Sequence, residues 1–340
     1  MSGACIFGVA GTSLSGEEAA FFRDVRPWGF ILFSRNIETP GQMQALTMSL
    51  REALDRPDAP VLIDQEGGRV QRMGPPNWRR YPPARAYGDL AAAGPRDRLE
   101  FARLGARLLA HDLAGVGVNV DCLPVLDLPT PGAHDVIGDR AYGRDAKEVA
   151  ALGRAAAEGL MAGGVLPVIK HIPGHGRAGA DSHHGLPVVD ATYADLEGRD
   201  FLPFKALADM PMAMTAHVVY AAIDGRAPAT TSRKVIGEVI RGAIGFDGLL
   251  MSDDLSMKAL SGDLAQRTLR SLAAGCDVVL HCNGDFAEMQ AVARAAGSLA
   301  GEAERRAADA LGRLPTTAEP FDADEARARF DAAFDGRWAA

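Results

Sequence analysis

Cysteine is scarce in this sequence, and long hydrophobic runs are missing from it. The four cysteines of the 340-residue chain include no CxxC pair, and three of them lie in apolar, strand-like runs, as buried free thiols do. This usage indicates a reducing compartment and not a disulfide framework. No apolar run approaches the roughly 20 residues of a membrane-spanning helix, and the N-terminus lacks the basic and apolar regions of a signal peptide. We therefore expect a cytoplasmic protein with no membrane partner.

Lysine is also scarce, and arginine supplies most of the 36 basic residues. The chain has five lysines, and its formal net charge at pH 7 is -8. A negative protein is not attracted to a phosphate backbone or to an anionic membrane surface, so nucleic acid is not expected as a partner. The sequence also lacks a linker and a low-complexity segment. We expect a single domain over residues 1–340, with the main body to about residue 315 and a looser C-terminal tail over 316–340.

Eight short apolar runs alternate with helical patterns along the chain. Because these runs are almost continuously apolar, they are typical of parallel strands buried on both faces. Eight strand–helix units predict an α/β fold, a (β/α)8 TIM barrel with a C-terminal helical extension. A doubly wound open sheet is the alternative, but the first run is not followed by a full GxGxxG turn. The expected strands cover residues 5–10, 29–33, 60–64, 116–121, 165–169, 212–217, 248–254 and 277–281.

Helical patterns fill the intervals between these runs. Residues 15–18, Ser-Gly-Glu-Glu, form the capping-box start of the first one. After residue 285 the chain is again helical in pattern and rich in alanine and arginine. The other expected helices cover residues 39–54, 99–113, 146–162, 192–207, 232–243 and 263–274.

Six of the eight expected strands end in ionisable side chains. Barrel enzymes place their chemistry at the carboxyl ends of the strands, so this recurrence predicts an active site there. Several of these side chains also have simpler interpretations: His217 and His281 as supporting residues, Asp121 and Asp127 as loop anchors, and Glu66 as the cap of a local turn. The strand-end residues are Asp64, Asp121 with Asp127, Lys170 with His171, His217, Asp253 with Asp254, and His281.

The segment after the fifth expected strand is the most polar of these ends. It reads Lys170-His171-Ile172-Pro173-Gly174-His175-Gly176 and continues to Asp181-Ser182-His183-His184. Residues two apart in an extended loop project to the same side, so the carboxylate of Asp181 is expected to orient the ring of His183. At the seventh strand end, adjacent residues face opposite ways, and the alternation favours Asp253 over Asp254 as the inward side chain.

These motifs resemble the signature of family 3 glycoside hydrolases, in the β-N-acetylglucosaminidase branch. The residues 64–72, Asp-Gln-Glu-Gly-Gly-Arg-Val-Gln-Arg, and 252–257, Ser-Asp-Asp-Leu-Ser-Met, match it as well. The resemblance implies a barrel enzyme without metal or cofactor, expected to be a monomer, that removes a terminal non-reducing β-N-acetylglucosamine. Its substrate would be a small carbohydrate or muropeptide, a GlcNAc-1,6-anhydroMurNAc fragment from cell-wall recycling, with or without the stem peptide.

The resemblance also implies roles for individual residues. Asp253 would be the nucleophile, His183 the general acid/base and Asp181 its orienting partner. A histidine suits the acid/base role because its unperturbed pKa, about 6.5, lies near working pH. In such a retaining mechanism the sugar is carried on the nucleophile before water releases it. The residues that resemble the family's sugar-binding set are Asp64, Arg72, Arg140, Lys170 and His171.

Other chemistries remain open at this point. A phosphorylase would release the same covalent intermediate with phosphate, and a substrate-assisted enzyme would use Asp253 and Asp254 to orient the N-acetyl group. A Schiff-base aldolase would use Lys170. A metal-dependent hydrolase would need a ligand set from His171, His175, Asp181, His183, His217 and His281, but the His-x-His of barrel metallohydrolases is missing from the first strand. Trp28 and Trp78 are interpreted as packing residues more readily than as sugar-stacking ones.

Overall fold

Eight parallel strands close into a barrel in the computed structural model, which describes residues 1–90, 94–182, 185–315 and 317–338. The order around the barrel follows the order along the chain, and the first strand pairs with both the second and the last. A doubly wound open sheet would leave two edges, so closure confirms the predicted (β/α)8 class. The barrel strands are β1 (Gly3–Gly8), β2 (Pro27–Leu32), β3 (Val61–Ile63), β6 (Val120–Asp121), β7 (Leu166–Ile172), β9 (Met212–Thr215), β11 (Leu249–Asp254) and β12 (Val278–His281).

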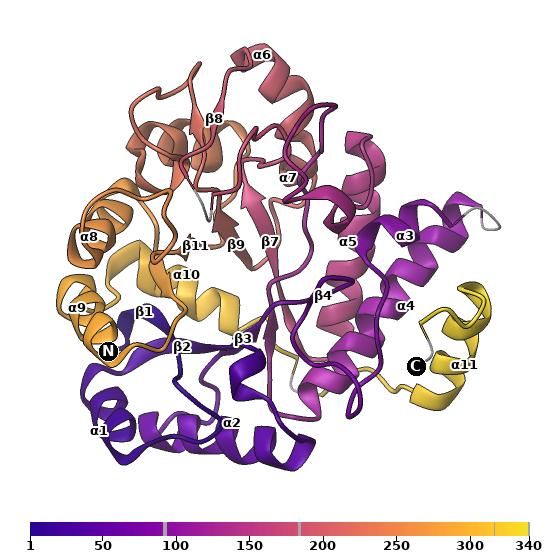
Figure 1. The fold of residues 1–340 in the computed structure, drawn as a ribbon, viewed down its shortest axis with the longest axis horizontal. Coiled ribbons are helices and arrows are strands. Elements are labelled where there is room, and N and C mark those ends of the chain that lie inside the picture. The colour runs from indigo at the N-terminus through magenta and orange to yellow at the C-terminus, as the bar shows by residue number, and fades with distance from the viewer. Residues whose placement is uncertain (91–93, 183–184, 316, 339–340) are drawn as a thin grey trace.

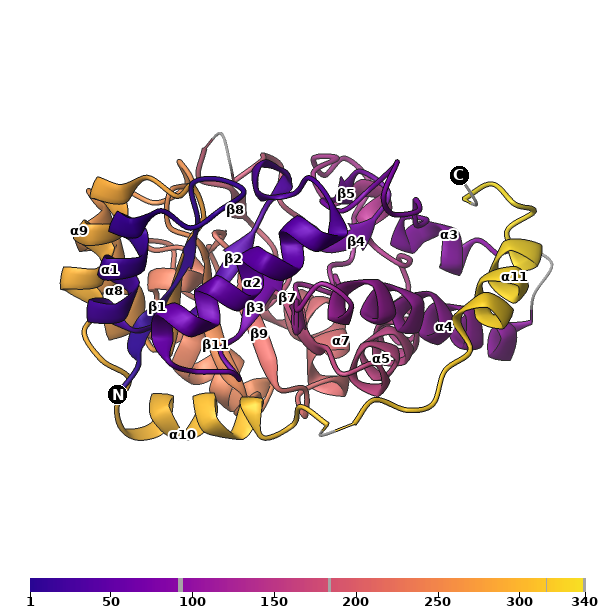
Figure 2. The same cartoon turned by 90° about the horizontal axis from the view of Figure 1, so that it is seen from below.

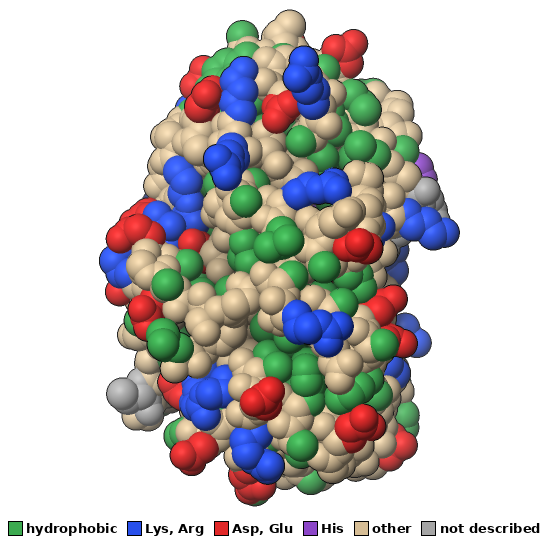
Figure 3. Space-filling model, turned by 90° about the vertical axis from the view of Figure 1, so that its left-hand side faces the viewer, with side chains coloured by type: hydrophobic (Ala, Val, Ile, Leu, Met, Phe, Trp, Pro, Cys, Tyr) green, Lys and Arg blue, Asp and Glu red, His purple; other side chains and the backbone are tan. Residues whose placement is uncertain are grey.

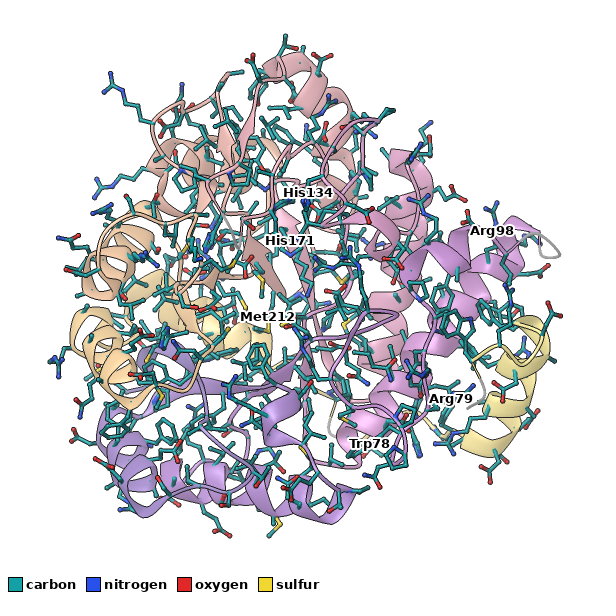
Figure 4. The ribbon with its side chains drawn as sticks, in the orientation of Figure 1. Trp78, Arg79, Arg98, His134, His171 and Met212 are labelled. Carbon is teal, nitrogen blue, oxygen red and sulfur yellow. The ribbon has the colours of Figure 1, made fainter. Side chains whose placement is uncertain are left out.

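The strands read as continuous apolar runs because each separates two apolar layers. One cluster contains alternate side chains such as Ile6, Val168 and Met251, and the larger cluster joins the other faces of the strands to the helices. Figure 4 places Met212 at the centre of the molecule. Trp28 is 1% exposed and belongs to the first cluster, which confirms its interpretation as a packing residue.

Helices surround the barrel in the ribbon view of Figure 1. Ser15 and Glu18 form the predicted capping box at the start of the first helix. Figure 2 shows α10 across one end of the barrel, while the short strands β4 (Gln65–Gly67), β5 (Val70–Gln71) and β8 (Val188–Val189) lie toward the opposite end. The helices with α geometry include α1 (Gly16–Val25), α2 (Pro40–Leu54), α3 (Ala84–Gly88), α4 (Pro95–Ala114), α5 (Ala146–Ala162), α8 (Leu264–Ala274), α9 (Phe286–Ala296) and α10 (Gly301–Leu311).

Two of the expected helices have a different geometry. The helix expected over 192–207 is divided into α6 (Tyr193–Asp195), the π-helix η3 (Leu196–Asp200) and α7 (Leu202–Ala206). Pro203 has no N–H to donate to a preceding turn, which is one reason for the break. The helix expected over 232–243 is the π-helix η5 (Val235–Ala243).

The segment expected to be a looser tail contains a packed helix, α11 (Ala323–Ala333), beside α4 (Figure 1). Its buried rings, Phe330 and Phe334, lie at a separation of four residues, on one helix face. They contact Tyr87 of α3 at centroid distances of 6.3 and 5.4 Å. The apolar pair is easily overlooked in an Ala/Arg-rich stretch.

No helix in the described part of the chain is long and apolar enough to cross a membrane. On the face drawn in Figure 3, acidic and basic side chains are interspersed with apolar ones.

Candidate active site

A hollow of about 760 Å³, which includes open space at its mouth, lies over the carboxyl ends of the strands. It brings together all five predicted sugar-binding residues and the predicted nucleophile, although they come from loops and strands far apart in the sequence. Apolar side chains such as Phe33, Val70 and Ile137 form part of its wall. The ionisable residues that line it are Asp64, Arg72, Arg140, Lys170, His171, His175, Asp253, Asp254 and Cys282.

Two carboxylates and three cations form one network on the floor of the hollow. Lys170 Nζ lies 2.9 Å from Asp64 Oδ1 and 2.7 Å from Glu66 Oε1. Arg72 donates to the other oxygen of Asp64 at 3.1 Å, and Arg140 donates to both oxygens of Glu66 at 2.8 Å. The network therefore carries a net charge of about +1, and its bidentate pair is the strongest geometry for an arginine and a carboxylate.

The charges of the network hold one another ionised. Burial would raise the pKa of Glu66, but Arg140 and Lys170 outweigh burial and lower it to about 2. Burial opposes ionisation of Asp64 too, yet Lys170 and Arg72 hold its pKa well below its usual range. Burial lowers the pKa of Lys170, but Asp64 and Glu66 raise it above its ordinary value. A Schiff-base lysine needs the opposite shift, so the aldolase alternative is disfavoured.

Glu66 has a different role from the local turn cap that the sequence suggested. It is buried, and its partners lie in the loop before α5 and in β7. The turn around it is built by the hairpin β4 (Gln65–Gly67) and β5 (Val70–Gln71), whose Gly67 has φ +89°. A Cβ on Gly67 would lie 2.3 Å from Pro82 O, so the Glu-Gly-Gly order lets the chain turn with Glu66 inside. A glutamate two residues after the strand-end Asp64 was the available signal.

Asp127 anchors the polar segment after β7. Its Oδ2 lies 2.6 Å from Nδ1 of His171, and its Oδ1 accepts from the backbone N–H of His175 at 2.6 Å. Burial would raise the pKa of Asp127, but His171 outweighs it, and the pKa is lowered. The loop-anchor interpretation of Asp127 is correct but incomplete, because it also fixes a ring that lines the hollow. Figure 4 labels His171 near the centre of the view.

The two aspartates at the end of β11 have different surroundings. The carboxylate of Asp254 accepts from Ser256 and, at 3.2 Å, from the backbone N–H of Cys282, so it holds the turn after the strand. Asp253 Oδ1 accepts from the backbone N–H of Asp254 at 2.8 Å. His217 lies behind them, with Nε2 3.0 Å from Asp254 O, as a supporting residue. The nucleophile role of Asp253 stays a prediction.

The loop that carries the predicted acid/base approaches this turn. The backbone N–H of Ala259 donates to Ser182 O at 3.2 Å, and Ser182 Oγ lies 3.3 Å from Nε2 of His175. Asp181 does not line the hollow, although it precedes Ser182 directly. His183 lies outside the described residues, so its pairing with Asp181 stays a prediction.

Within the described ranges, no three His, Cys, Asp or Glu side chains are arranged to hold a metal ion. Of the ligand set considered above, His217 faces Thr230 and a backbone carbonyl, and His281 lies 3.3 Å from Glu288. These two rings are engaged away from His171.

The closed parallel barrel carries paired acids and cations at the carboxyl ends of its strands, which is where barrel enzymes place their active sites. Residues 12–316 match the N-terminal domain of glycosyl hydrolase family 3. The chain is 40% identical over 279 residues to a β-hexosaminidase of Bordetella avium, with 81% of this chain and 79% of the relative covered. It is 43% identical over 288 residues to one from Alkalilimnicola ehrlichii, with 83% and 81% covered. The chain belongs to glycosyl hydrolase family 3, and it is a glycoside hydrolase.

Solved structures agree with this placement. NagZ from Neisseria gonorrhoeae, in complex with a zinc ion, has a TM-score of 0.82 at 30% identity, with 98% of this chain and 96% of that one covered. A family 3 β-N-acetylglucosaminidase from a Paenibacillus species has a TM-score of 0.85 at 30% identity and covers 97% of this chain, which spans 66% of that longer protein.

Proposed function

We propose that this chain is a retaining exo-β-N-acetylglucosaminidase that removes the non-reducing terminal N-acetylglucosamine from GlcNAc-1,6-anhydroMurNAc fragments, with or without the stem peptide, in cell-wall recycling. The broader activity, that of a β-N-acetylhexosaminidase of family 3, follows from the β-hexosaminidase relatives. The observation that carries the proposal is the convergence of Asp253 with five charged or ring side chains in a single hollow.

The hollow suits a sugar because its polar groups are fixed before a ligand arrives. Lys170, Arg72 and Arg140 offer charged donors, and Asp64 is held ionised as an acceptor. Sugar hydroxyls both donate and accept, so a fixed set of paired donors and acceptors selects their positions at little reorganisation cost.

The reaction runs in two displacements in this proposal. Asp253 attacks the anomeric carbon, the bond from that carbon to the leaving oxygen breaks, and His183 gives its proton to that oxygen. Water then attacks the same carbon while His183 takes the proton from the water, and the bond to Asp253 breaks to release the sugar. Asp181 orients the ring of His183 and favours its charged form, as the aspartate does in a Ser-His-Asp triad. Retention of configuration follows from the two inversions.

Turnover of aryl β-N-acetylglucosaminides with a series of leaving groups tests this proposal. His183→Ala should lose at least about a hundredfold on poor leaving groups and much less on an activated aryl group, because only the former need the proton. Equal losses on both would contradict the acid/base role. A fluorinated sugar should label Asp253, and a label on Asp254 would overturn the nucleophile assignment.

Two experiments separate the remaining chemistries, and a third tests the substrate. Turnover that requires phosphate would identify a phosphorylase. Strong inhibition by an oxazoline-mimicking thiazoline would identify substrate assistance. The rates on the matching glucoside and N-acetylgalactosaminide should be far lower than on the N-acetylglucosaminide, and equal rates would contradict the proposed substrate.

A further inference from the structure

We infer that Asp127 is a positioning residue for sugar binding: it keeps a ring proton on Nδ1 of His171 and so presents Nε2 of that ring to the sugar. The sugar contact rests on the proposed function, whereas the state of the ring does not.

Asp127 is rigidly placed relative to β7. It is 0% exposed, and the backbone N–H of the residue before it, Leu126, donates to Lys170 O at 2.7 Å. Val125 forms a parallel bridge with Lys170, and Asp127 itself accepts from the backbone N–H of His175 at 2.6 Å. The segment that carries the carboxylate and the segment that carries the ring of His171 are therefore joined by a parallel backbone bridge and by a hydrogen bond from backbone to side chain.

The hydrogen bond between the carboxylate of Asp127 and the ring of His171 has a defined donor and acceptor. Oδ2 of Asp127 lies 2.6 Å from Nδ1 of His171. An ionised carboxylate only accepts hydrogen bonds, so Nδ1 must carry the proton whether the ring is neutral or charged. The lowered pKa of Asp127 agrees with an ionised acceptor. The ring of His175 packs edge-to-face against His171 at 5.7 Å between centroids, which limits rotation of the pair.

His171 lines the hollow, and because Asp127 engages Nδ1, we assign Nε2 as the ring nitrogen that meets the sugar. A neutral ring with its proton on Nδ1 has a lone pair on Nε2, which accepts from a hydroxyl group. Such an acceptor is valuable here, because each oxygen of Asp64 and Glu66 already accepts from a cation. The cations themselves only donate. With the proton on Nε2 instead, neutral His171 would offer a further donor.

Nitrogen-15 NMR of the histidine side chains tests the state of the ring. In the wild-type protein, the signals that His171→Gln removes should show a proton on Nδ1. Asp127→Asn keeps an oxygen that accepts from His175, but its amide N–H donates to Nδ1, so the neutral ring should carry its proton on Nε2. A wild-type ring with its proton on Nε2 would overturn the inference, and so would an unchanged neutral ring in the variant. The wild-type spectrum decides the first point even where the variant fails to fold.

Kinetics of the same variant test the sugar contact. Asp127→Asn should raise KM for an aryl N-acetylglucosaminide about ten- to hundredfold, because a hydroxyl that donated to Nε2 now meets a donor. The matched control is Asp277→Asn, a buried carboxylate at the amino end of β12 that pairs with Arg241 and Arg306. This control should lower the melting temperature and leave KM and the His171 signals unchanged. An unchanged KM in Asp127→Asn would overturn the sugar contact.

The two proposals fail in different ways. A wild-type enzyme that hydrolyses no N-acetylglucosaminide, but whose neutral ring moves its proton to Nε2 in Asp127→Asn, would refute the proposed substrate and support the positioning of the ring. A wild-type enzyme that hydrolyses N-acetylglucosaminides, but whose neutral His171 carries its proton on Nε2, would support the proposed substrate and refute the positioning of the ring.

Discussion

At the scale of single residues, a buried glutamate holds in place two of the cations that are predicted to bind the sugar. Glu66 has a side chain that is 4% exposed, and it contacts Arg140 and Lys170 at once. Removing one member of a buried ion network leaves the others with charge that is not compensated, which costs far more than the network adds. Loss of the Glu66 charge should therefore destabilise the site more than loss of a turn cap would.

Replacement of this charge should affect both stability and binding. We expect Glu66→Gln to lower the free energy of unfolding by about 3 kcal/mol and to raise KM at least about tenfold, since Arg140 loses its carboxylate partner and Lys170 loses one of two. Urea denaturation and steady-state kinetics measure the two effects. The matched control is Glu148→Gln, which alters the more exposed pair with Arg98. Similar effects of the two variants would contradict a special role for Glu66.

A buried histidine should make the protein less stable in mild acid. Burial first, and then the neighbouring His171, lowers the pKa of His175 from 6.5 to about 4. The unfolded chain therefore binds a proton between pH 6.5 and pH 4 that the folded chain does not, so stability falls as the pH drops through this window.

The predicted size of this effect follows from the two pKa values. Between pH 7 and pH 5, His175 should remove about 2 kcal/mol from the free energy of unfolding. Over the same interval, the free energy of unfolding of His175→Gln should fall by about 2 kcal/mol less than that of the wild type. Urea denaturation at both pH values measures this difference. His134→Gln, at an exposed position, should behave as the wild type does. An equal pH dependence in His175→Gln and the wild type would refute the prediction.

At the scale of elements, a π-helix anchors the base of the loop that contains Asp181. The side chain of Asp200, the last residue of η3, is 1% exposed and accepts from Arg177 Nε at 2.7 Å. The phenol of Tyr220, in β10 (Val219–Tyr220), donates to Gly174 O at 2.7 Å on the same loop. Residues in π geometry are shifted around the axis relative to an α-helix, and such segments are frequent at functional sites.

Loss of this anchor should slow the reaction more than it weakens binding. We expect Asp200→Ala to lower kcat about tenfold on poor leaving groups, with a smaller change in KM, because Arg177 loses its partner at the base of the loop. Glu197→Gln is the matched control, since it alters a more exposed pair with Lys205 in the same helical segment. An equal fall of kcat on activated and poor leaving groups would argue against an effect through the acid/base loop.

At the scale of the whole molecule, α11 supports the segment that leads to the site. Arg79, in the loop after β5, pairs with Asp331 and donates to Trp338 O at 3.0 Å. The side chain of Gln71 in turn donates to Arg79 O at 2.7 Å, directly before Arg72. The C-terminal helix is thus linked to the network by a continuous series of contacts.

Removal of a ring from this helix should destabilise the fold. Phe330 is 0% exposed, and Phe330→Ala should lower the free energy of unfolding by about 3–5 kcal/mol, as for other buried rings. Arg329→Ala, on the same helix but half exposed, should change it by no more than about 0.5 kcal/mol. Thermal or urea denaturation measures both, and a Phe330→Ala protein as stable as the wild type would show that α11 is dispensable.

The barrel class was accessible to sequence reasoning because each strand is buried on both faces. A strand that is buried on both faces appears in the sequence as a nearly continuous apolar run. All eight predicted runs overlap the observed strands. Boundaries were less accurate where a strand is short: residues 116–121 were expected to be extended, whereas β6 is Val120–Asp121. The π-helices were not predicted, since their apolar pattern over so few turns differs little from that of an α-helix.

The sequence by itself determined which residue types end the strands, because apolar runs followed by ionisable and glycine-containing motifs are local patterns. Only the tertiary structure decided their partners. Arg140 and Lys170 meet Glu66, and His171 meets Asp127, because barrel closure brings the carboxyl ends of successive strands to one rim. The local pattern of apolar and polar residues indicates which residues are buried, but it does not show which charged residue of another strand will lie beside them. The ion network could therefore be identified only from the tertiary structure.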